Sequence, residues 1–266
     1  MVSFCNGKVT VFQSRIYCTN STIVEFEDSV IICDPSWFPD EIDSIRNFVE
    51  RNYFDKKQFL FITHFDYDHV WGWKAFADAE IIAPDWSYAS QLKNKCLKEW
   101  ADWDEAHYVK RSYQPRFPDK IHYQLTEPTS IRLGSMKINF VPVPGHTIDS
   151  FAAYVPDYGL LLAGDYLSDV EIPWISSGVS EYEQSLDYLK NIIEQLNPLL
   201  VIPGHGNARS DRAELLQNLE QAKWYLDNFN SIDEEIIKSI ENYINSFPFS
   251  GSSRKIHIEN LEVNNR

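Results

Sequence analysis

Short apolar runs recur along the chain, and longer amphipathic segments lie between them. A short, mostly apolar run predicts a β-strand, because a strand buried within a layered sheet turns neither face to water. Glu27-Asp28-Ser29, which separates two of these runs, predicts a hairpin turn. The predicted strands are Val9–Phe12, Thr22–Phe26, Val30–Cys33, Phe59–Ile62, Ile121–Leu125, Ile131–Leu133, Lys137–Val143, Phe151–Val155, Leu160–Ala163 and Leu199–Ile202.

Apolar positions with helical spacing predict helices between and after these runs. Pro39 opens the first helix, and the next ends before Pro198, because proline suits a first helical turn and restricts the residue before it. The last helix begins at Ser231-Ile232-Asp233-Glu234, which has the form of a capping box. The apolar stripes are Ile42, Ile45, Phe48 and Val49; Tyr182, Leu186, Leu189, Ile193 and Leu196; Leu215, Leu219, Ala222 and Leu226; and Ile236, Ile237, Ile240, Tyr243 and Ile244.

This alternation of strands and helices is typical of layered α/β architecture. No break in composition marks a linker, so the sequence predicts a single domain over residues 1–266, with C-terminal helices over 210–247. Residues 85–118 differ, because aromatic side chains lie among charged ones there and the first part has helical character. This segment is either a lid or substrate wall, or a surface helix with its aromatic side chains turned inward. These aromatic residues are Trp86, Tyr88, Trp100, Trp103 and Tyr108.

Acidic residues outnumber basic ones by 39 to 24, which gives a formal net charge of −15. Binding to nucleic-acid phosphates depends on Lys and Arg, so we expect no nucleic-acid partner. No apolar run approaches the roughly 18 residues of a membrane helix, and no secretory signal is visible, so we expect no membrane partner. The 4 cysteines are scattered without a C-x-x-C pair, which predicts reduced thiols and a cytoplasmic protein. A small molecule is the expected substrate, and a homo-oligomer is left open.

Side chains that can bind metals follow several of the apolar runs, where the loops of a layered α/β protein gather into sites. Imidazole and carboxylate groups together suit zinc, iron, manganese or cobalt. They are more numerous than the ligands of one tetrahedral ion, whereas two ions about 3.5–4 Å apart use them all. The candidate ligands are His64, Asp66, Asp68, His69, His146, Asp165 and His205, and Asp34 follows an earlier run.

The motif His64-Phe65-Asp66-Tyr67-Asp68-His69 resembles the first signature of the metallo-β-lactamase-fold metallohydrolases. Pro-Gly-His-Thr at His146, Gly-Asp at Asp165 and Pro-Gly-His-Gly at His205 match the later elements of that family in order. The resemblance covers residues 20–207. It implies an α/β fold of the αββα type, a four-layer sandwich of two mixed β-sheets flanked by helices.

The resemblance also implies a dinuclear centre and a hydrolytic mechanism. A metal-bound hydroxide attacks the substrate, and Asp68 orients this hydroxide and accepts its proton. Asp34 orients a ligand imidazole through the ring nitrogen that does not bind metal. The implied ligands are His64, Asp66 and His146 at the first ion and Asp68, His69 and His205 at the second ion, with Asp165 bridging both.

Asp66 departs from the family signature, which has histidine at this position. Flavodiiron reductases of the same fold family carry glutamate there and bind iron, but the 61 residues after His205 show no flavin-binding signal. The expected cofactors are therefore two divalent metal ions, with zinc first and iron or manganese favoured by Asp66. A weak or empty first site is the alternative consequence of the shorter side chain.

These expectations converge on a dinuclear metal-dependent hydrolase that acts on an ester, thioester, lactone or related small substrate. A non-haem iron redox protein is one alternative, since Asp66 favours iron. A non-catalytic binding protein with a degraded site is the other. A nuclease is disfavoured by the net negative charge.

Several side chains near the motifs are candidates for contact with the substrate. Tyr67 and Tyr166 are candidate donors to a developing oxyanion. Arg111 or Arg116 is a candidate partner for an anionic group. Three tryptophans either line an aromatic substrate pocket or pack in the core, namely Trp71, Trp73 and Trp174.

Overall fold

The computed structural model describes residues 1–85, 89–114 and 116–264. The chain divides into two compact units, Met1–Phe140 and Val141–Arg266, and each has its own buried apolar core. The single domain that the sequence predicts stays a prediction. Among the described residues, no helix combines the length and apolar character that a membrane span needs.

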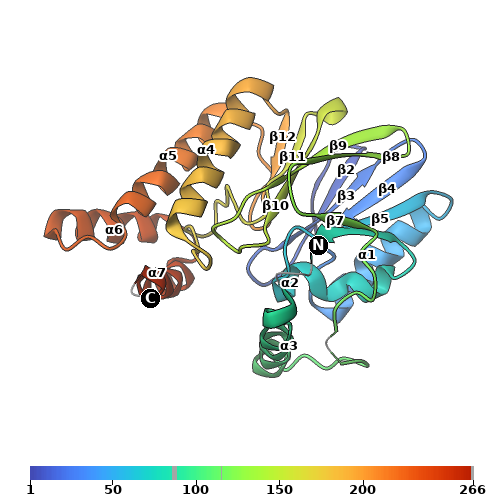
Figure 1. The fold of residues 1–266 in the computed structure, drawn as a ribbon, viewed down its shortest axis with the longest axis horizontal. Helices are drawn as coiled ribbons and strands as arrows, with labels where there is room; N and C mark the ends of the chain where they lie inside the picture. Colours follow the sequence, from blue (N-terminus) through green and yellow to red (C-terminus); the bar gives the residue numbers. More distant parts are fainter. Residues whose placement is uncertain (86–88, 115, 265–266) are drawn as a thin grey trace. The chain divides into compact units, whose positions relative to one another are not determined.

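The first unit is built on a seven-stranded mixed sheet with the strand order β1-β2-β3-β4-β5-β6-β7 (Figure 1). Strands β1 to β4 pair antiparallel, and β4 to β7 pair parallel. Strands β8 and β9 pair as an antiparallel hairpin. The bounds are β1 Val2–Cys5, β2 Val9–Gln13, β3 Asn20–Glu25, β4 Ser29–Cys33, β5 Lys57–Phe61, β6 Glu80–Pro84, β7 Tyr123–Leu125, β8 Thr129–Leu133 and β9 Met136–Pro142.

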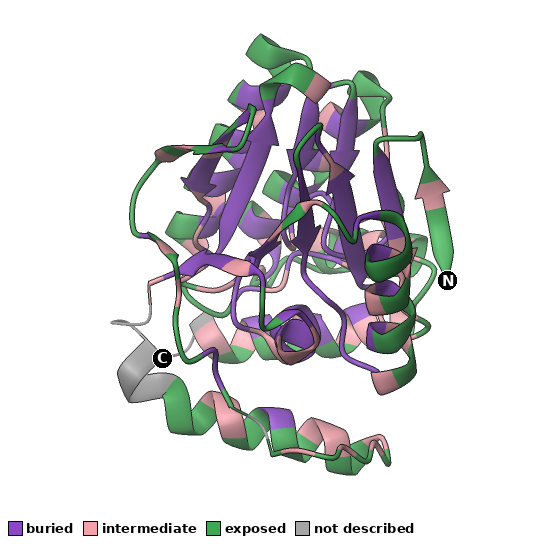
Figure 2. Cartoon of the chain, turned by 90° about the vertical axis from the view of Figure 1, so that its right-hand side faces the viewer, coloured by how far each residue is buried: buried purple, intermediate pink, exposed green. Residues whose placement is uncertain are grey.

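Helix α1 covers this sheet with the apolar stripe that the sequence predicts. Pro39 opens the helix, and Ile42, Ile45 and Val49 are buried on one face, the last two in one cluster with Leu60 of β5. Figure 2 shows the central strands buried, whereas β1 at the N-terminus is largely exposed. The helical segments of this unit are α1 Pro39–Asn52, α2 Tyr67–Val70, the 3-10 helix η1 Trp71–Phe76 and α3 Ala89–Ala106.

The second unit contains a smaller mixed sheet, in which β10 and β11 pair antiparallel and β11 and β12 pair parallel. Helices α4 and α5 pack side by side (Figure 1), and their apolar faces share one buried cluster with the strands. The elements are β10 Phe151–Val155, the 3-10 helix η2 Pro156–Tyr158, β11 Leu160–Leu162, α4 Val179–Leu196, β12 Leu200–Ile202, α5 Arg212–Asn228, α6 Glu234–Ser246 and α7 Ser250–Asn264.

The predicted strands and helices are confirmed, with shifts of a few residues at their ends, but the short segments α2, η1 and η2 and three longer elements were missed. Strand β1 is exposed and lacks an apolar run, and β6 has only a short one. Helix α7 follows the two predicted terminal helices, and its apolar positions are weakly periodic.

The predicted capping box at Ser231 is wrong. Helix α6 begins at Glu234, and its cap is Asp233, whose carboxylate accepts hydrogen bonds from the amides of Glu235 (2.9 Å) and Ile236 (3.1 Å). An aspartate in this position satisfies free amides of the first turn by itself.

The segment 85–118 contains α3, as its helical character predicts, and its aromatic side chains have different surroundings. Trp100 is buried in the core of the first unit, and Trp103 packs against that core, whereas Tyr108 is exposed. Trp86 and Tyr88 lie outside the described residues. Inward packing is therefore confirmed for Trp100, and a lid function of the segment stays a prediction.

Candidate metal centre

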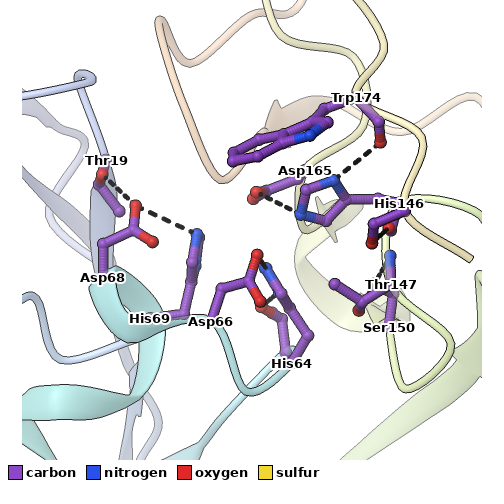
Figure 3. Close-up of polar contacts among 12 residues, drawn as sticks. Thr19, His64, Asp66, Asp68, His69, His146, Thr147, Ser150, Asp165 and Trp174 are labelled. Atoms are coloured by element: carbon purple, nitrogen blue, oxygen red, sulfur yellow. Dashed lines mark hydrogen bonds and ion pairs between the residues drawn. The ribbon is translucent and has the colours of Figure 1, made fainter. Parts of the chain in front are cut away.

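In the first unit, the candidate ligands follow β5 and lie on or next to the short helix α2. The carbonyl of Asp66 accepts hydrogen bonds from the amides of His69 (3.1 Å) and Val70 (3.2 Å), and this turn starts α2. Imidazoles and carboxylates therefore lie next to one another (Figure 3). Nε2 of His64 is 3.6 Å from Oδ2 of Asp66, and Nε2 of His69 is 3.6 Å from Oδ2 of Asp68.

These four side chains differ in burial. His64 and His69 are fully buried, and Asp68 is only 5% exposed, so water reaches these groups poorly. The side chain of Asp66 is 37% exposed. Among these four candidate ligands, Asp66 is thus the one that retains substantial contact with solvent.

Asp34 lies at the end of β4 and holds two segments of the first unit together. Its Oδ1 accepts a hydrogen bond from the amide of Thr63 (2.9 Å), and its Oδ2 accepts one from the hydroxyl of Thr63 (2.8 Å). Nδ1 of His69 is 3.0 Å from the same Oδ2. Because a carboxylate only accepts, we assign the proton of this imidazole to Nδ1, which leaves the lone pair on Nε2.

The hydroxyl of Thr63 extends this arrangement to His64. Its oxygen lies 2.9 Å from Nδ1 of His64. The single hydroxyl proton is donated to Asp34, so the hydroxyl oxygen accepts from Nδ1–H of His64. Asp34 therefore orients His69 directly and His64 through Thr63.

Thr19 is a residue that the sequence analysis missed. It is 2% exposed, and its hydroxyl donates to Oδ2 of Asp68 at 2.7 Å (Figure 3). It follows Tyr17 and Cys18, which both adopt left-handed backbone conformations with φ of 57° and 53°. Burial and the nearby Asp68 carboxylate raise the pKa of Tyr17. No motif marks Thr19, because its partner lies 49 residues away in the sequence.

Aromatic side chains surround α2 within the first unit. The ring of Tyr67 is stacked on Trp103 with 4.4 Å between centroids, and it meets the edge of Trp37 at 5.2 Å. Trp71 and Trp73 are buried, which confirms core packing for these two residues. A catalytic role for the Tyr67 hydroxyl stays a prediction.

Arg111 is occupied within the first unit. Its guanidinium lies 2.5 Å from Asp104 and over the ring of Trp71, and its side chain is only 4% exposed. Arg116 pairs with Asp119 at the surface, where such a pair contributes little to stability. A buried and paired guanidinium is a poor contact for a substrate anion, so the structure does not favour Arg111 in that role.

In the second unit, parallel pairing brings two candidate ligands together. Leu162 of β11 lies opposite Ile202 of β12, and the loops that follow carry Asp165 and His205, each three residues further on. Nε2 of His205 is 3.2 Å from Oδ2 of Asp165. Nε2 of His146 lies 3.1 Å from the same oxygen (Figure 3).

The segment Trp174–Ser177 encloses His146. The carbonyl of Trp174 lies 3.0 Å from Nδ1 of His146, and it accepts the ring proton because a carbonyl cannot donate. The amide of Ser176 donates to the carbonyl of His146 at 3.0 Å. The amide of Gly145 donates to the hydroxyl of Ser177 at 2.9 Å. We refer to Trp174–Ser177 as the His146 cradle.

Gly145 allows the loop that carries His146 to approach helix α4. Its φ is +127°, and a Cβ atom there would lie 2.3 Å from Cα of Tyr182. Only glycine avoids both the backbone strain and this collision. Glycine is thus needed before His146 for a local structural reason, independently of what the histidine binds.

Glu171 is a second residue that the sequence analysis missed. One oxygen each of Asp165 and Glu171 and one ring nitrogen of His205 all lie within 4.8 Å of one another. Glu171 belongs to no recognised motif and follows Asp165 in the same loop. Only its distance to the other two groups identifies it.

Tyr166 has both hydroxyl functions occupied inside the second unit. The hydroxyl donates to the carbonyl of Pro144 at 2.7 Å and accepts from the amide of His146 at 3.2 Å. The side chain is 1% exposed, and burial raises its pKa, so the phenol stays neutral. Its predicted role as a donor to the substrate stays a prediction.

Both sets of side chains have the chemistry of metal ligands. Nδ1 is engaged by a neighbouring group in His64, His69 and His146, and Nε2 of each lies within 4 Å of a carboxylate oxygen. This is the usual arrangement of metal-binding histidines, whose second nitrogen donates to an outer partner. The residues therefore fit divalent zinc, manganese or iron, which accept imidazole and carboxylate donors.

Comparisons with known proteins agree with this chemistry. The sequence profile of the Metallo-beta-lactamase superfamily matches residues 18–205. A Metallo-beta-lactamase type 2 from Bacillus cereus is 22% identical over 215 residues, covering 80% of this chain and 76% of the relative. An Acyl-coenzyme A thioesterase MBLAC2 from Gallus gallus is 26% identical over 155 residues, covering 54% of this chain and 55% of the relative.

Solved structures match the fold. A metallo-beta-lactamase from Pontibacter korlensis aligns with a TM-score of 0.60 at 16% identity, covering 86% of this chain and 99% of that one. A metallo-beta-lactamase family protein from Thermus thermophilus aligns with a TM-score of 0.64 at 15% identity, covering 98% of this chain and 95% of that one. The predicted α/β class of two mixed sheets flanked by helices is confirmed.

Proposed function

The chain belongs to the metallo-β-lactamase superfamily, and from that premise we propose that it is a hydrolase that uses two divalent metal ions. Members of this superfamily are generally hydrolytic and bind divalent metals, typically zinc. The observation that carries the proposal is the carboxylate of Asp165, whose Oδ2 lies 3.1 Å from Nε2 of His146 and 3.2 Å from Nε2 of His205. Two imidazole nitrogens this close to one carboxylate oxygen suit a carboxylate ligand that two metal ions share, with one histidine at each ion.

The proposed ligand sets follow the family signature and add one residue. The signature would assign His64, Asp66 and His146 to the first ion, Asp68, His69 and His205 to the second, and Asp165 to both. Glu171 is a further carboxylate close to the Asp165 and His205 donors, and we include it as a ligand or a support for one.

The metal ions, when bound, supply an activated water at neutral pH and polarise the bond to be cleaved. The protein holds the groups around them. Thr19 donates to Oδ2 of Asp68 and so fixes the plane of this carboxylate, which is the proposed acceptor of the water proton. Asp34 accepts the Nδ1 proton of His69, which leaves Nε2 of that ring free of a proton, and it also accepts the hydroxyl proton of Thr63.

We propose zinc as the metal, with manganese or iron as the alternative that Asp66 favours. A carboxylate in place of an imidazole hardens the ligand set, and Glu171 adds a second hard donor. Manganese and iron accept ligand sets that are rich in carboxylates. The proposed set contains no thiolate, which is the softer ligand that would select zinc.

The substrate class that we propose is an ester, thioester, lactone or related small molecule. The named relatives include a β-lactamase and an acyl-coenzyme A thioesterase, and these act on carbonyl centres. A fold hosts many chemistries, so this class rests on the site and on those relatives together.

The first test is the metal content of protein purified without chelator or added metal, measured by elemental analysis. About two zinc or manganese ions per chain support the proposal. Asp165→Asn should lose most of this metal, whereas Asp157→Asn, an exposed change in the same unit, should retain it. The metal-loaded enzyme is then screened on esters, lactones, thioesters and phosphodiesters.

The same measurement separates the alternatives. Two iron ions with oxygen uptake and no hydrolysis indicate a redox protein, and the absence of bound metal indicates a binding protein. One ion per chain that rises to two in Asp66→His shows that Asp66 weakens the first site. Each of these three results overturns the dinuclear hydrolase in its proposed form.

A further inference from the structure

The C-terminal helix α7 contacts the loop that contains the His146 cradle, although the superfamily profile ends at residue 205. Asn260, on α7, is fully buried. A buried asparagine is costly unless its amide is satisfied. Its hydrogen bonds therefore indicate what the helix is holding.

Asn260 bonds to both sides of Trp174. Its Oδ1 accepts from the amide of Ile175 at 2.8 Å, and its Nδ2 donates to the carbonyl of Pro173 at 2.7 Å. The same Nδ2 donates to the hydroxyl of Tyr225 on α5 at 3.0 Å. One side chain thus fixes the backbone immediately before and after Trp174.

A second contact joins the same helix to Trp174. The carboxylate of Glu259 interacts with the Trp174 side chain. Two adjacent residues of α7 thus interact with the backbone around Trp174 and with its side chain. The contacts of Asn260 and Glu259 together restrict the position of the Trp174 carbonyl more than either contact alone.

The Trp174 carbonyl is the group that holds Nδ1 of His146. A shift of the Pro173–Ile175 backbone moves this carbonyl, and Nε2 of His146 turns with the ring. We propose that Asn260 is a positioning residue, which sets the orientation of His146 and thereby the metal affinity of the centre. This inference rests on the proposed function, because it requires His146 to be a metal ligand.

Removing the Asn260 amide leaves the Ile175 amide and the Pro173 carbonyl buried without their partner. Such groups are costly to leave unpaired, so the loop relaxes toward other partners. Loss of an outer partner of a metal-binding histidine lowers metal affinity about 10–100-fold. Asn260 acts one step further out, and we expect about a tenfold loss.

The test compares zinc affinity in four variants of the full chain by competition with a chromogenic chelator, after removal of bound metal. Asn260→Ala removes the side chain, and Asn260→Leu removes its polar contacts while filling a similar volume. Tyr225→Phe removes the third partner of Asn260, together with the contact of that hydroxyl to Nδ1 of His257 (2.9 Å), and leaves both loop contacts in place. Asn228→Ala, at the C-terminal end of α5, is the matched control, because its side-chain amide donates to the carbonyl of Trp224 on its own helix and to no other described residue.

We expect both Asn260 variants to bind zinc about tenfold more weakly, and Tyr225→Phe and Asn228→Ala to stay within about twofold of the wild type. The unfolding midpoint should fall in Tyr225→Phe as well as in Asn260→Ala, because each loses a buried hydrogen bond. The absorption spectrum of the cobalt-substituted protein should change only in the Asn260 variants. This combination separates positioning from general stability.

Wild-type zinc affinity and an unchanged cobalt spectrum in folded Asn260→Leu would overturn the inference, as would an equal loss of affinity in Tyr225→Phe. Failure of the wild-type protein to bind any divalent metal is a different result, because it overturns the proposed function itself. If Asn260→Ala does not fold, Asn260→Leu provides the comparison.

Discussion

The two sets of candidate ligands are oriented in different ways. In the first unit, His64 and His69 belong to one short segment, and the side chains of Asp34 and Thr63 hold their Nδ1 atoms. In the second unit, the ligands come from three separate loops, and the main-chain carbonyl of Trp174 holds Nδ1 of His146.

This difference determines how each set responds to change. A side-chain partner is deleted by one substitution, whereas a main-chain carbonyl is lost only when its loop moves. A carboxylate partner also makes an imidazole a stronger ligand than a neutral carbonyl does, because it stabilises the positive charge that develops on the ring. We therefore expect the first set to be sensitive to single outer substitutions and the second to depend on the packing of its loops.

The largest effect should follow Asp34→Ala. The change removes the carboxylate that accepts from three buried donors, namely the amide of Thr63, the hydroxyl of Thr63 and Nδ1 of His69. We expect a loss of metal affinity of about 100-fold, and a decrease of about 3 kcal/mol in the free energy of unfolding. Chelator competition and chemical denaturation measure the two quantities. Asp55→Ala, an exposed change in the same unit, is the control, and equal metal affinity in the two variants contradicts the expectation.

Thr63→Val should have an intermediate effect. Valine keeps the shape of threonine and the amide contact to Asp34, but it removes the hydroxyl that connects Asp34 with His64. We expect about a tenfold loss of metal affinity, less than for Asp34→Ala because His69 keeps its partner. The exposed Thr126→Val is the matched control. Metal binding as tight as in that control means that the hydroxyl does not orient His64.

Tyr166→Phe decides between two roles for the hydroxyl in the second unit. If the hydroxyl only supports the loop, the free energy of unfolding falls by about 1–2 kcal/mol and kcat at saturating metal stays close to the wild-type value. We expect this result, because the hydroxyl already donates to Pro144. A large fall in kcat with unchanged metal content supports the oxyanion role instead. Tyr67→Phe is the parallel measurement in the first unit.

The smallest effect concerns His257, whose Nδ1 lies 2.9 Å from the hydroxyl of Tyr225. Burial lowers the pKa of His257 below its ordinary value, so the unfolded chain binds the proton more readily than the folded one. The free energy of unfolding should therefore decrease as the pH falls below about 6.5. Denaturation of wild type and His257→Gln on both sides of that pH measures the effect. An unchanged pH slope in the variant shows that another group titrates there.

The sequence predicted those parts of the fold and site that are encoded locally. Apolar runs mark the strands because burial on both faces demands them, and the His64–His69 motif is one continuous segment that leads into α2. His146, Asp165 and His205 each follow a predicted strand, so their placement at strand ends could be expected.

Residues whose partners are distant in the chain could not be predicted. Thr19 bonds to a residue 49 positions away, and Asn260 to one 85 positions away. The opposition of Leu162 and Ile202, which brings two ligands together, depends on strand register rather than on any local pattern. Glu171 lies near Asp165 only because their shared loop folds back.

The backbone at Asp34 has a φ of 51°, in the left-handed region, and this limits which sequences can occupy the end of β4. Glycine, asparagine and aspartate adopt this conformation at the lowest cost. Only aspartate among them also offers a carboxylate to His69. Glutamate retains the charge but adds a methylene group and strain, and asparagine retains the backbone but loses the charge. Each of these substitutions at Asp34 therefore has a cost, in backbone strain or in the lost contact to His69. Substitutions at Thr63 or Asn260 offer more freedom for changing the metal affinity of the centre.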